Sequence, residues 1–273
     1  MSASRSAGPD LSDALGQEPP AAASQEPARV GPKEGYRRWA ATYDEFPNPL
    51  LAREERYLMP LLPDLTGKDV LDLACGTGRW LQKLLERGAR SGVGVDYSTA
   101  MLRVASRKAT IGNQLACADC LRLPFRASIF DFGICSFALS HIQDLKQMAH
   151  ELARVMKPNG IVFVSDLHPE AYARGWRTGF RDGRGACQIA VPPPAAEQVV
   201  RAFYSGGFEC LTHIALCLGD AERRILVEAG KRDLSELFRV PAVLSYQFVL
   251  IRSSEATSRK MVIPSHWGCR GSD

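Results

Sequence analysis

The chain has 273 residues, of which 45% are hydrophobic and 23% charged, and its formal net charge is +4. Such a chain can bury one substantial core, and none of its apolar runs reaches the ~20 residues that a membrane-spanning helix needs. The mild charge does not require a polyanionic partner, so we expect a protein without a membrane span and do not expect nucleic acid as its partner.

The chain begins with a segment of distinct composition. Residues 1–32 are rich in Ala, Ser, Pro and Gln and contain few large apolar side chains, so they cannot offset the entropy that is lost on ordering. We therefore predict a disordered N-terminal tail over 1–32, a folded domain over 33–252 and a flexible C-terminal tail over 253–273. The N-terminal tail shows neither the apolar core of a secretory signal nor the Arg-rich, acid-poor pattern of a transit peptide, which predicts a cytoplasmic protein.

Residues 33–60 are expected to form a helical cap, after which strands and helices alternate. Five strands are predicted, near 69–73, 91–95, 114–117, 131–136 and 161–166, with helical stretches such as 98–109 and 144–156 between them. This alternation predicts an α/β protein with a parallel sheet and right-handed crossovers. The chain then continues with a helix near 195–205 and two late strands, 208–216 and 244–252.

A short apolar strand runs into a glycine-rich turn at residues 70–78, Val-Leu-Asp-Leu-Ala-Cys-Gly-Thr-Gly. Gly76 and Gly78 let the backbone approach a ligand, and the helix that begins after them offers unpaired N–H groups. A dinucleotide-binding turn needs a small residue where this chain has Leu81. Asp72, which precedes the glycines, would repel a pyrophosphate but attract a cationic amine. The turn therefore indicates a ligand that carries positive charge near it.

Five segments, in this order along the chain, resemble the successive motifs of class I S-adenosylmethionine-dependent methyltransferases. They are residues 70–78, 94–98, 117–125, 130–141 and 154–160. The similarity is greatest to the small-molecule branch that includes ubiquinone/menaquinone C-methyltransferases and the malonyl-carrier-protein O-methyltransferase. It is specific over residues 36–166 and general from there to Arg252. It implies a Rossmann-like sandwich with a mostly parallel seven-stranded sheet, an antiparallel edge strand and helices on both faces.

The resemblance also implies a cofactor, S-adenosyl-L-methionine, which becomes S-adenosyl-L-homocysteine, and a contact for each motif residue. The implied cofactor-binding residues are Tyr43, Asp72, Ala74, Gly76, Gly78, Asp96, Tyr97, Met101, Asp119, Cys120, Ser136 and Phe137. Asp72 and the turn after it would hold the methionyl amino and carboxylate groups, and Asp96 would accept both ribose hydroxyls. Asp119 would accept from the adenine amine, Tyr43 would close over the cofactor, and the last two residues would line the methionine arm. Ala74 stands where the family most often has Gly, and its methyl group fits if φ is negative.

Residues 167–195, between the fifth and sixth strands, are individual to this chain. Four arginines stand there among aromatic residues and glycines: Arg174, Arg177, Arg181 and Arg184. One interpretation is a mobile substrate lid in which Trp176, Arg177 and Arg181 contact an anionic acceptor. The other, which we favour because runs of charge usually face water, is a solvated surface loop.

Methyl transfer needs little from the protein beyond alignment and exclusion of water, unless the acceptor must lose a proton with a high pKa. His141, just after the fourth strand, and His168, just after the fifth, are candidates for such a catalytic base because both follow the carboxyl ends of strands. Each is also a common loop or helix-start residue, so the catalytic base is left open. No metal is expected, because Cys117 and Cys120 form an isolated pair without a second pair or a nearby His at zinc spacing.

The sequence therefore predicts an S-adenosylmethionine-dependent methyltransferase that acts on a small-molecule acceptor, anionic under the lid interpretation. Two alternatives stay open: a nucleic-acid or protein methyltransferase, and a catalytically silent cofactor-binding partner subunit. Base-amino methyltransferases of this fold usually carry Asn/Asp-Pro-Pro-aromatic after the fourth strand, where residues 135–138 read Cys-Ser-Phe-Ala. The intact acids Asp72, Asp96 and Asp119 argue against a silent subunit. Whether oxygen, carbon, nitrogen or sulfur accepts the methyl group is left open.

Overall fold

The computed structural model describes residues 26–251 of the chain. Residues 1–25 and 252–273, which hold most of the two predicted tails, lie outside this range. The N-terminal tail was predicted to reach residue 32, but β1 (Ala28–Arg29) already pairs in parallel with β8 (Gly185–Ile189). The folded part therefore begins earlier than the composition indicates, because the strand that pairs with this segment lies far along the chain.

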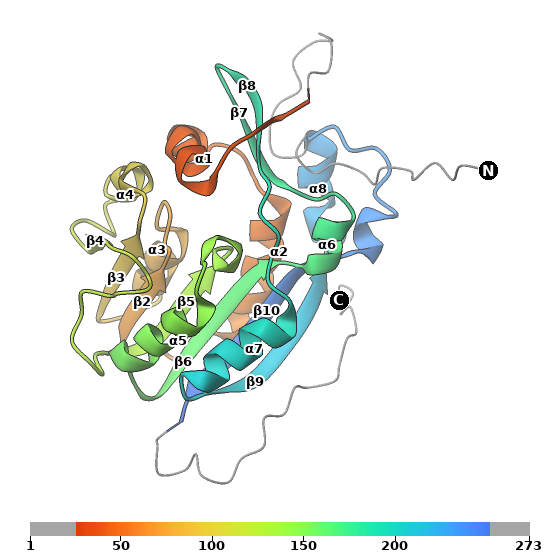
Figure 1. Ribbon diagram of the computed structural model, residues 1–273. Helices are drawn as coiled ribbons and strands as arrows, with labels where there is room; N and C mark the ends of the chain where they lie inside the picture. Colours follow the sequence, from red (N-terminus) through yellow and green to blue (C-terminus); the bar gives the residue numbers. More distant parts are fainter. Residues whose placement is uncertain (1–25, 252–273) are drawn as a thin grey trace.

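A seven-stranded sheet forms the centre of the molecule, with the strand order β4-β3-β2-β5-β6-β10-β9 (Figure 1). Its strands are β2 (Asp69–Leu73), β3 (Ser91–Asp96), β4 (Leu115–Cys117), β5 (Phe130–Ser136), β6 (Met156–Leu167), β9 (Phe208–Cys217) and β10 (Pro241–Leu250). The first five of these pair in parallel, and β10 is antiparallel to both of its neighbours, β6 and β9. The predicted Rossmann-like sheet, mostly parallel with an antiparallel pair at its edge, is confirmed.

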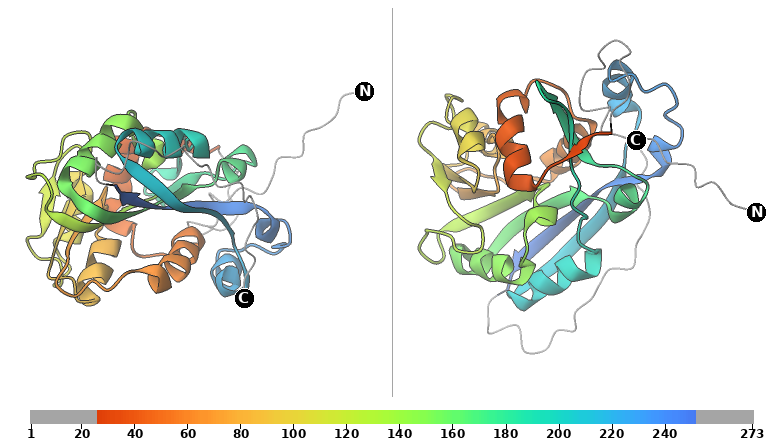
Figure 2. Two further views of the ribbon diagram at one scale, coloured as in Figure 1. Left: turned by 90° about the horizontal axis from the view of Figure 1, so that it is seen from below. Right: turned by 45° about the horizontal axis from the view of Figure 1, so that its top comes forward.

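Helices cover both faces of this sheet (Figure 2). α5 (Leu145–Val155) and α7 (Ala196–Ser205) pack on one face, and α2 (Pro49–Leu58) and α3 (Arg79–Glu86) pack on the other. The remaining helices are α1 (Pro32–Trp39), α4 (Thr99–Ala105), α6 (Pro169–Ala173) and α8 (Asp220–Glu228), with short 3-10 turns at Ala40–Thr42, Met59–Leu61, Leu139–His141 and Leu237–Arg239. Within residues 26–251, no helix has the length and apolar character to cross a membrane.

Side chains of polar residues determine where several helices begin. Asn48 Oδ1 accepts a hydrogen bond from the Leu50 N–H at 2.9 Å, and Pro49 stands at the first helical position of α2. Asp144 Oδ1 likewise accepts from the Gln147 N–H at the start of α5, at 2.9 Å. These acceptors satisfy N–H groups that have no partner within the helix, which is why Asn and Asp are preferred at such positions.

The segment that was interpreted as a lid or a surface loop forms an ordered hairpin on the cap. Its strands β7 (Thr178–Asp182) and β8 are antiparallel, and Figure 1 shows them beside α1. Trp39 of α1 stacks on Phe180 with ring centroids 5.3 Å apart, and Arg38 donates two hydrogen bonds to the Asp182 carboxylate. A Cβ on Gly35 would lie 2.6 Å from Ile189, so only glycine lets α1 approach β8 this closely. Cap and hairpin are therefore one packed unit.

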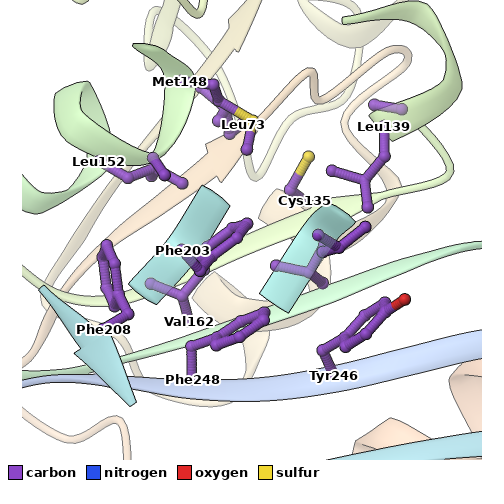
Figure 3. Close-up of a cluster of buried hydrophobic side chains, with 14 of the residues drawn as sticks. Leu73, Cys135, Leu139, Met148, Leu152, Val162, Phe203, Phe208, Tyr246 and Phe248 are labelled. Atoms are coloured by element: carbon purple, nitrogen blue, oxygen red, sulfur yellow. The ribbon is translucent and has the colours of Figure 1, made fainter. Parts of the chain in front are cut away.

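The largest cluster of buried hydrophobic residues holds α5 and α7 against the sheet (Figure 3). Phe203 of α7 stacks on Phe248 of β10, with ring centroids 4.0 Å apart and planes 7° from parallel. Phe208 of β9 packs against Phe203 at 5.4 Å with the rings tilted. Because these aromatic pairs join α7 to the last two strands, they stabilise the antiparallel edge of the sheet.

Replacing Phe248 by Ala should lower the free energy of unfolding by about 3–5 kcal/mol, because the side chain is fully buried and its removal leaves a cavity. Phe46, which is 42% exposed, is the matched control, and Phe46→Ala should change stability by less than about 0.5 kcal/mol. Urea denaturation followed by circular dichroism measures both. Equal losses in the two variants would contradict the packing described for Phe248.

Candidate functional site

The main cavity of the molecule lies at the carboxyl ends of β2, β3, β4 and β5 and has about 1480 Å³ of empty space, part of it open to solvent. From β2 the chain continues through β3 to β4 at one edge of the sheet, and β5 then pairs with the opposite side of β2. Ligands of open α/β sheets bind beside the point where the strand order reverses in this way. All of the predicted cofactor-binding residues except Asp72 and Gly78 line it: Tyr43, Ala74, Gly76, Asp96, Tyr97, Met101, Asp119, Cys120, Ser136 and Phe137.

Gly76 and Asp96 form the centre of the cavity wall. Gly76 has φ 55°, and no atom lies within 4 Å of the place where a Cβ would stand, so its backbone borders open space. Its N–H donates to Asp96 Oδ2 at 2.8 Å, and the Ser98 N–H donates to Asp96 Oδ1 at 2.7 Å. Burial raises the pKa of the Asp96 carboxyl, although these backbone N–H groups act in the opposite direction. The carboxylate is held in one orientation and keeps lone pairs for ligand hydroxyls.

Ala74 departs from the expected backbone conformation. The methyl group was expected to fit because φ would be negative, but the structure gives φ 55°. The chain bends here directly after β2, so that the Cys75 N–H donates to the Val95 carbonyl of the neighbouring β3 at 2.9 Å. Left-handed φ values cost an L-residue about 1–2 kcal/mol, so a strained alanine occupies a position where glycine would be unstrained.

Asp72 and Gly78 shape the turn from outside the cavity. Asp72 is 2% exposed, and its Oδ2 accepts from the Leu81 N–H at 2.8 Å. That N–H belongs to the first turn of α3. Gly78 holds the capping position of this helix and has no side chain that could accept a hydrogen bond from it. A Cβ on Gly78 would lie 2.4 Å from Ile111. The carboxylate of Asp72 thus caps α3 beneath the turn, and its predicted contact with a cationic ligand group stays a prediction.

The outer part of the cavity combines exposed and buried side chains. Tyr97 is 60% exposed, and the Lys33 Nζ lies 5.1 Å from the centre of its ring. Met101 is 2% exposed, and Asp119 accepts from the Leu121 N–H at 2.9 Å. Burial raises the pKa of the Cys120 thiol to about 12, which keeps it protonated at neutral pH. In the part of the chain that the structure describes, no group of three His, Cys, Asp or Glu residues is placed to hold a metal ion.

A buried carboxylate that the sequence did not indicate joins the cap to the site. Glu54 of α2 is fully buried and accepts hydrogen bonds from Ser136 Oγ at 2.7 Å and from Trp80 Nε1 at 3.1 Å. The guanidinium of Arg79 and the hydroxyl of Ser165 donate to the same carboxylate. Nothing in the sequence distinguishes Glu54 from its neighbour in the helix, because its donors come from β5, β6 and α3.

A side pocket with about 730 Å³ of empty space, part of it open to solvent, adjoins the main cavity. Tyr36, Tyr43 and Phe137 line both spaces and form their common wall. The side pocket continues between the cap, the end of β6 and the lid segment, and aromatic or aliphatic side chains form most of its surface. Asp166 is the only Asp or Glu that lines it within the described residues.

The lid residues take different positions relative to this pocket. Of the three lid residues predicted to contact a substrate, Trp176 and Arg177 line this pocket and Arg181 does not. Arg177 Nη1 donates to the carbonyls of Tyr172 and Trp176 at 2.6 and 2.7 Å, and its guanidinium lies 3.7 Å from the centre of the Tyr172 ring. The one lid arginine at the pocket is therefore bound to the lid itself, which removes most of the basis for an anionic acceptor.

The two histidines predicted as candidate bases lie in different places. His141 lines the main cavity, and its Nε2 lies 2.9 Å from the Tyr36 hydroxyl. Burial lowers the pKa of His141 to about 4, so its ring is neutral at pH 7. His168 lines neither space: it caps α6, where its Nδ1 accepts from the Glu170 N–H at 3.1 Å. The suggestion that His168 acts as a base is thus not supported by its position.

Comparisons with known proteins agree with the motifs. Residues 70–160 match a family described as "Methyltransferase domain". An uncharacterized methyltransferase of Schizosaccharomyces pombe is 36% identical over 135 residues, which cover 42% of this chain and 47% of that protein. The demethylmenaquinone methyltransferase of Lactococcus lactis is 35% identical over 118 residues, which cover 41% of this chain and 47% of that protein. The chain thus spans about half the length of the curated relatives it matches.

Solved structures share the architecture. An S-adenosylmethionine-dependent methyltransferase of Mesorhizobium loti superimposes with a TM-score of 0.59 at 22% identity, covering 73% of this chain and 99% of that one. Identity at this level shows the fold alone. Together with the sequence matches, it confirms the predicted resemblance to class I S-adenosylmethionine-dependent methyltransferases.

Asp72→Asn should change how stability depends on pH. Burial raises the pKa of Asp72 to about 7, so the folded protein holds a proton that the unfolded chain releases from about pH 4 upward. The wild type should therefore lose stability relative to the variant between pH 4.5 and 8, by up to about 4 kcal/mol. Urea denaturation at several pH values measures the difference. Parallel pH curves for the two proteins would contradict it.

His168→Ala should lower the free energy of unfolding by about 1 kcal/mol, the usual cost of losing a helix cap, because α6 loses the acceptor at its start. Its dissociation constant for S-adenosylhomocysteine, measured by isothermal titration calorimetry, should equal that of the wild type. A marked loss of affinity would show that His168 contributes to the main cavity.

Proposed function

We propose that this protein is a methyltransferase that binds S-adenosylmethionine in the main cavity and a small-molecule acceptor in the side pocket. The observation that carries the proposal is the common wall of Tyr36, Tyr43 and Phe137. Transfer between two bound molecules requires that the reacting atoms meet at about 3–3.5 Å, and two adjoining spaces that share a wall permit such a meeting.

The residues of the main cavity fit this cofactor. The open space at Gly76 admits a ligand against the backbone of the turn, and the oriented Asp96 carboxylate suits a pair of ribose hydroxyls. Met101 offers an apolar surface for a flat ring, and the carboxylate of Asp119 can accept from an exocyclic amine. When bound, the cofactor supplies a methyl group that its sulfonium has already activated.

The chain's own residues would then orient the two ligands and exclude water. Tyr43 comes from the cap and stands in the common wall, so the cap covers the place where the ligands would meet. Glu54 holds the cap to the ends of β5 and β6, and the stack of Trp39 on Phe180 holds the hairpin to the cap. Alignment and exclusion of water supply much of the rate enhancement in such a reaction.

Two observations favour a small molecule over nucleic acid or protein as the acceptor. The side pocket is lined mainly by apolar and aromatic side chains, as small-ligand sites usually are. Residues of the cap and the lid segment line it, whereas a macromolecular acceptor would need an open surface here. The name of the Lactococcus lactis relative, a demethylmenaquinone methyltransferase, also denotes a small-molecule acceptor. That name applies to the relative, and the acceptor of the present chain is our proposal.

Asp96→Asn should raise the dissociation constant for S-adenosylhomocysteine about 10- to 100-fold, because one or more hydrogen bonds to a charged group are lost. Isothermal titration calorimetry measures the constant, and near-ultraviolet circular dichroism checks that the variant is folded. Asp233→Asn is the control, because Asp233 is exposed and lines neither the main cavity nor the side pocket. Equal affinity in both variants would place the cofactor elsewhere.

Transfer itself is measured with cofactor labelled in its methyl group, offered with extracts of small molecules. We expect the label to appear in a small-molecule fraction, and Asp96→Asn should reduce the amount of label transferred. Tight binding of the cofactor with no transfer to any fraction would instead support the silent partner subunit. Label in nucleic acid or protein would support the macromolecular alternative.

A further inference from the structure

We propose that Asp166 accepts the hydroxyl group of a neutral aromatic acceptor in the side pocket and takes its proton, so that this chain methylates the oxygen of phenol-type molecules. The inference rests on the proposed function and deepens it, because it names the chemical class of the acceptor and the residue that receives the proton. The polar groups of the side pocket are the observations that support this inference.

Asp166 is held rigidly at the end of β6. It is 5% exposed, and its Oδ2 accepts from the Ser140 N–H while its Oδ1 accepts from the Leu167 N–H, both at 2.7 Å. No Lys or Arg forms an ion pair with it in the part of the chain that the structure describes. Each carboxylate oxygen has a lone pair beyond the one used by the backbone. The pocket therefore contains an oriented acceptor without a cationic partner.

The acidity of Asp166 suits a proton acceptor. Burial raises its pKa to about 6, while the N–H groups of Ser140 and Leu167 and the side chain of Ser140 lower it. The carboxylate is thus ionised at pH 7 to 8 and closer in basicity to a phenol than an exposed aspartate would be. A general base works best when its pKa lies near the working pH.

A second polar group of the pocket needs an acceptor. Trp176 is 1% exposed, and its Nε1 has no hydrogen-bond partner among residues 26–251. Buried indole N–H groups usually have a partner, so a ligand oxygen is the natural candidate in a pocket that this side chain lines. Trp176 lies on the lid segment and Asp166 on β6, so a ligand between them would join the lid to the sheet.

A hydroxyl is the group that satisfies both residues. It donates to Asp166 and accepts from Trp176, whereas an ammonium could serve only Asp166 and an ether only Trp176. A carboxylate or phosphate is disfavoured, because Asp166 would repel it and Arg177 is engaged by carbonyls of the lid. The aromatic rings of Tyr36 and Trp39 in the pocket favour a flat, apolar body for the acceptor.

The proposed step balances without a further reactant. The acceptor oxygen forms a bond to the methyl carbon as the bond between that carbon and sulfur breaks, and the electron pair of the broken bond stays on sulfur. The hydroxyl proton passes to Asp166, which releases it to solvent when the products leave. The products are the methyl ether and the neutral thioether form of the cofactor.

Binding of three probes to protein saturated with S-adenosylhomocysteine tests the inference by calorimetry. The probes are 1-naphthol, its ether 1-methoxynaphthalene, which cannot donate, and the anion 1-naphthoate. In the wild type, 1-naphthol should bind about 10-fold more tightly than the ether and than the anion. Asp166→Asn should abolish the preference for 1-naphthol over the ether, with unchanged affinity for S-adenosylhomocysteine.

A second variant separates the two polar contacts. Trp176→Phe removes the N–H but keeps an aromatic ring, so it should weaken 1-naphthol and the ether by the same factor of about 3 to 10 and keep the preference between them. Asp233→Asn should change none of these values. With labelled cofactor, the wild type should convert 1-naphthol to the ether, and Asp166→Asn should do so at least 100-fold more slowly.

Three results would overturn the inference. They are tighter binding of 1-naphthoate than of 1-naphthol to the wild type, an unchanged preference for 1-naphthol in Asp166→Asn, and no binding of 1-naphthol to protein that binds S-adenosylhomocysteine. Failure of the proposed function is distinguishable from these, because the wild type would then bind no S-adenosylhomocysteine, or would bind it and transfer no label to any small-molecule fraction.

Discussion

The geometry of the site depends on one buried carboxylate, that of Glu54. It lies on α2 in the cap, yet its hydrogen-bond donors are Ser136 at the end of β5, Ser165 in β6, and Arg79 and Trp80 at the start of α3. Burying a charge is costly unless hydrogen bonds and an ion pair compensate it, so α2 cannot shift along the sheet without leaving this carboxylate unsatisfied. The cap therefore has one defined position over the carboxyl ends of the strands.

The turn after β2 shows how a binding surface is supported from behind. The backbone of Gly76 borders open space because this residue has no side chain. Gly78 occupies the capping position of α3 and likewise provides no side chain to cap the helix. Asp72 supplies that acceptor from within the strand, at the cost of a buried carboxyl group with a raised pKa. Ala74 adds a left-handed residue in the same turn. Strain and burial are concentrated at this turn because the surrounding sheet is rigid enough to maintain them.

The two spaces of the site are built in different ways. The main cavity is formed chiefly by residues that follow β2, β3, β4 and β5. The side pocket is assembled from the cap, the end of β6 and the lid segment. The hairpin β7–β8 packs on α1 through Trp39 and Phe180, so the lid and the cap form its walls together. The side pocket, which we propose as the acceptor site, is therefore bounded by the cap and the lid segment and not by the strand-end motifs of the main cavity.

The resemblance to a known family implied ten of the residues that line the main cavity, and the sequence by itself determined the alternating order of elements and the glycine turn. These depend on contacts within one strand, turn and helix, and local patterns such as apolar runs and acids at strand ends express them directly. Only the tertiary structure decided that Asp72 caps a helix, that Arg177 is bound to its own lid, and that Glu54 and Asp166 belong to the site. These roles depend on how the folded chain places each side chain, and for Glu54 and Asp166 also on donors from other elements. No local pattern in the sequence records which buried groups the fold will bring within hydrogen-bond distance.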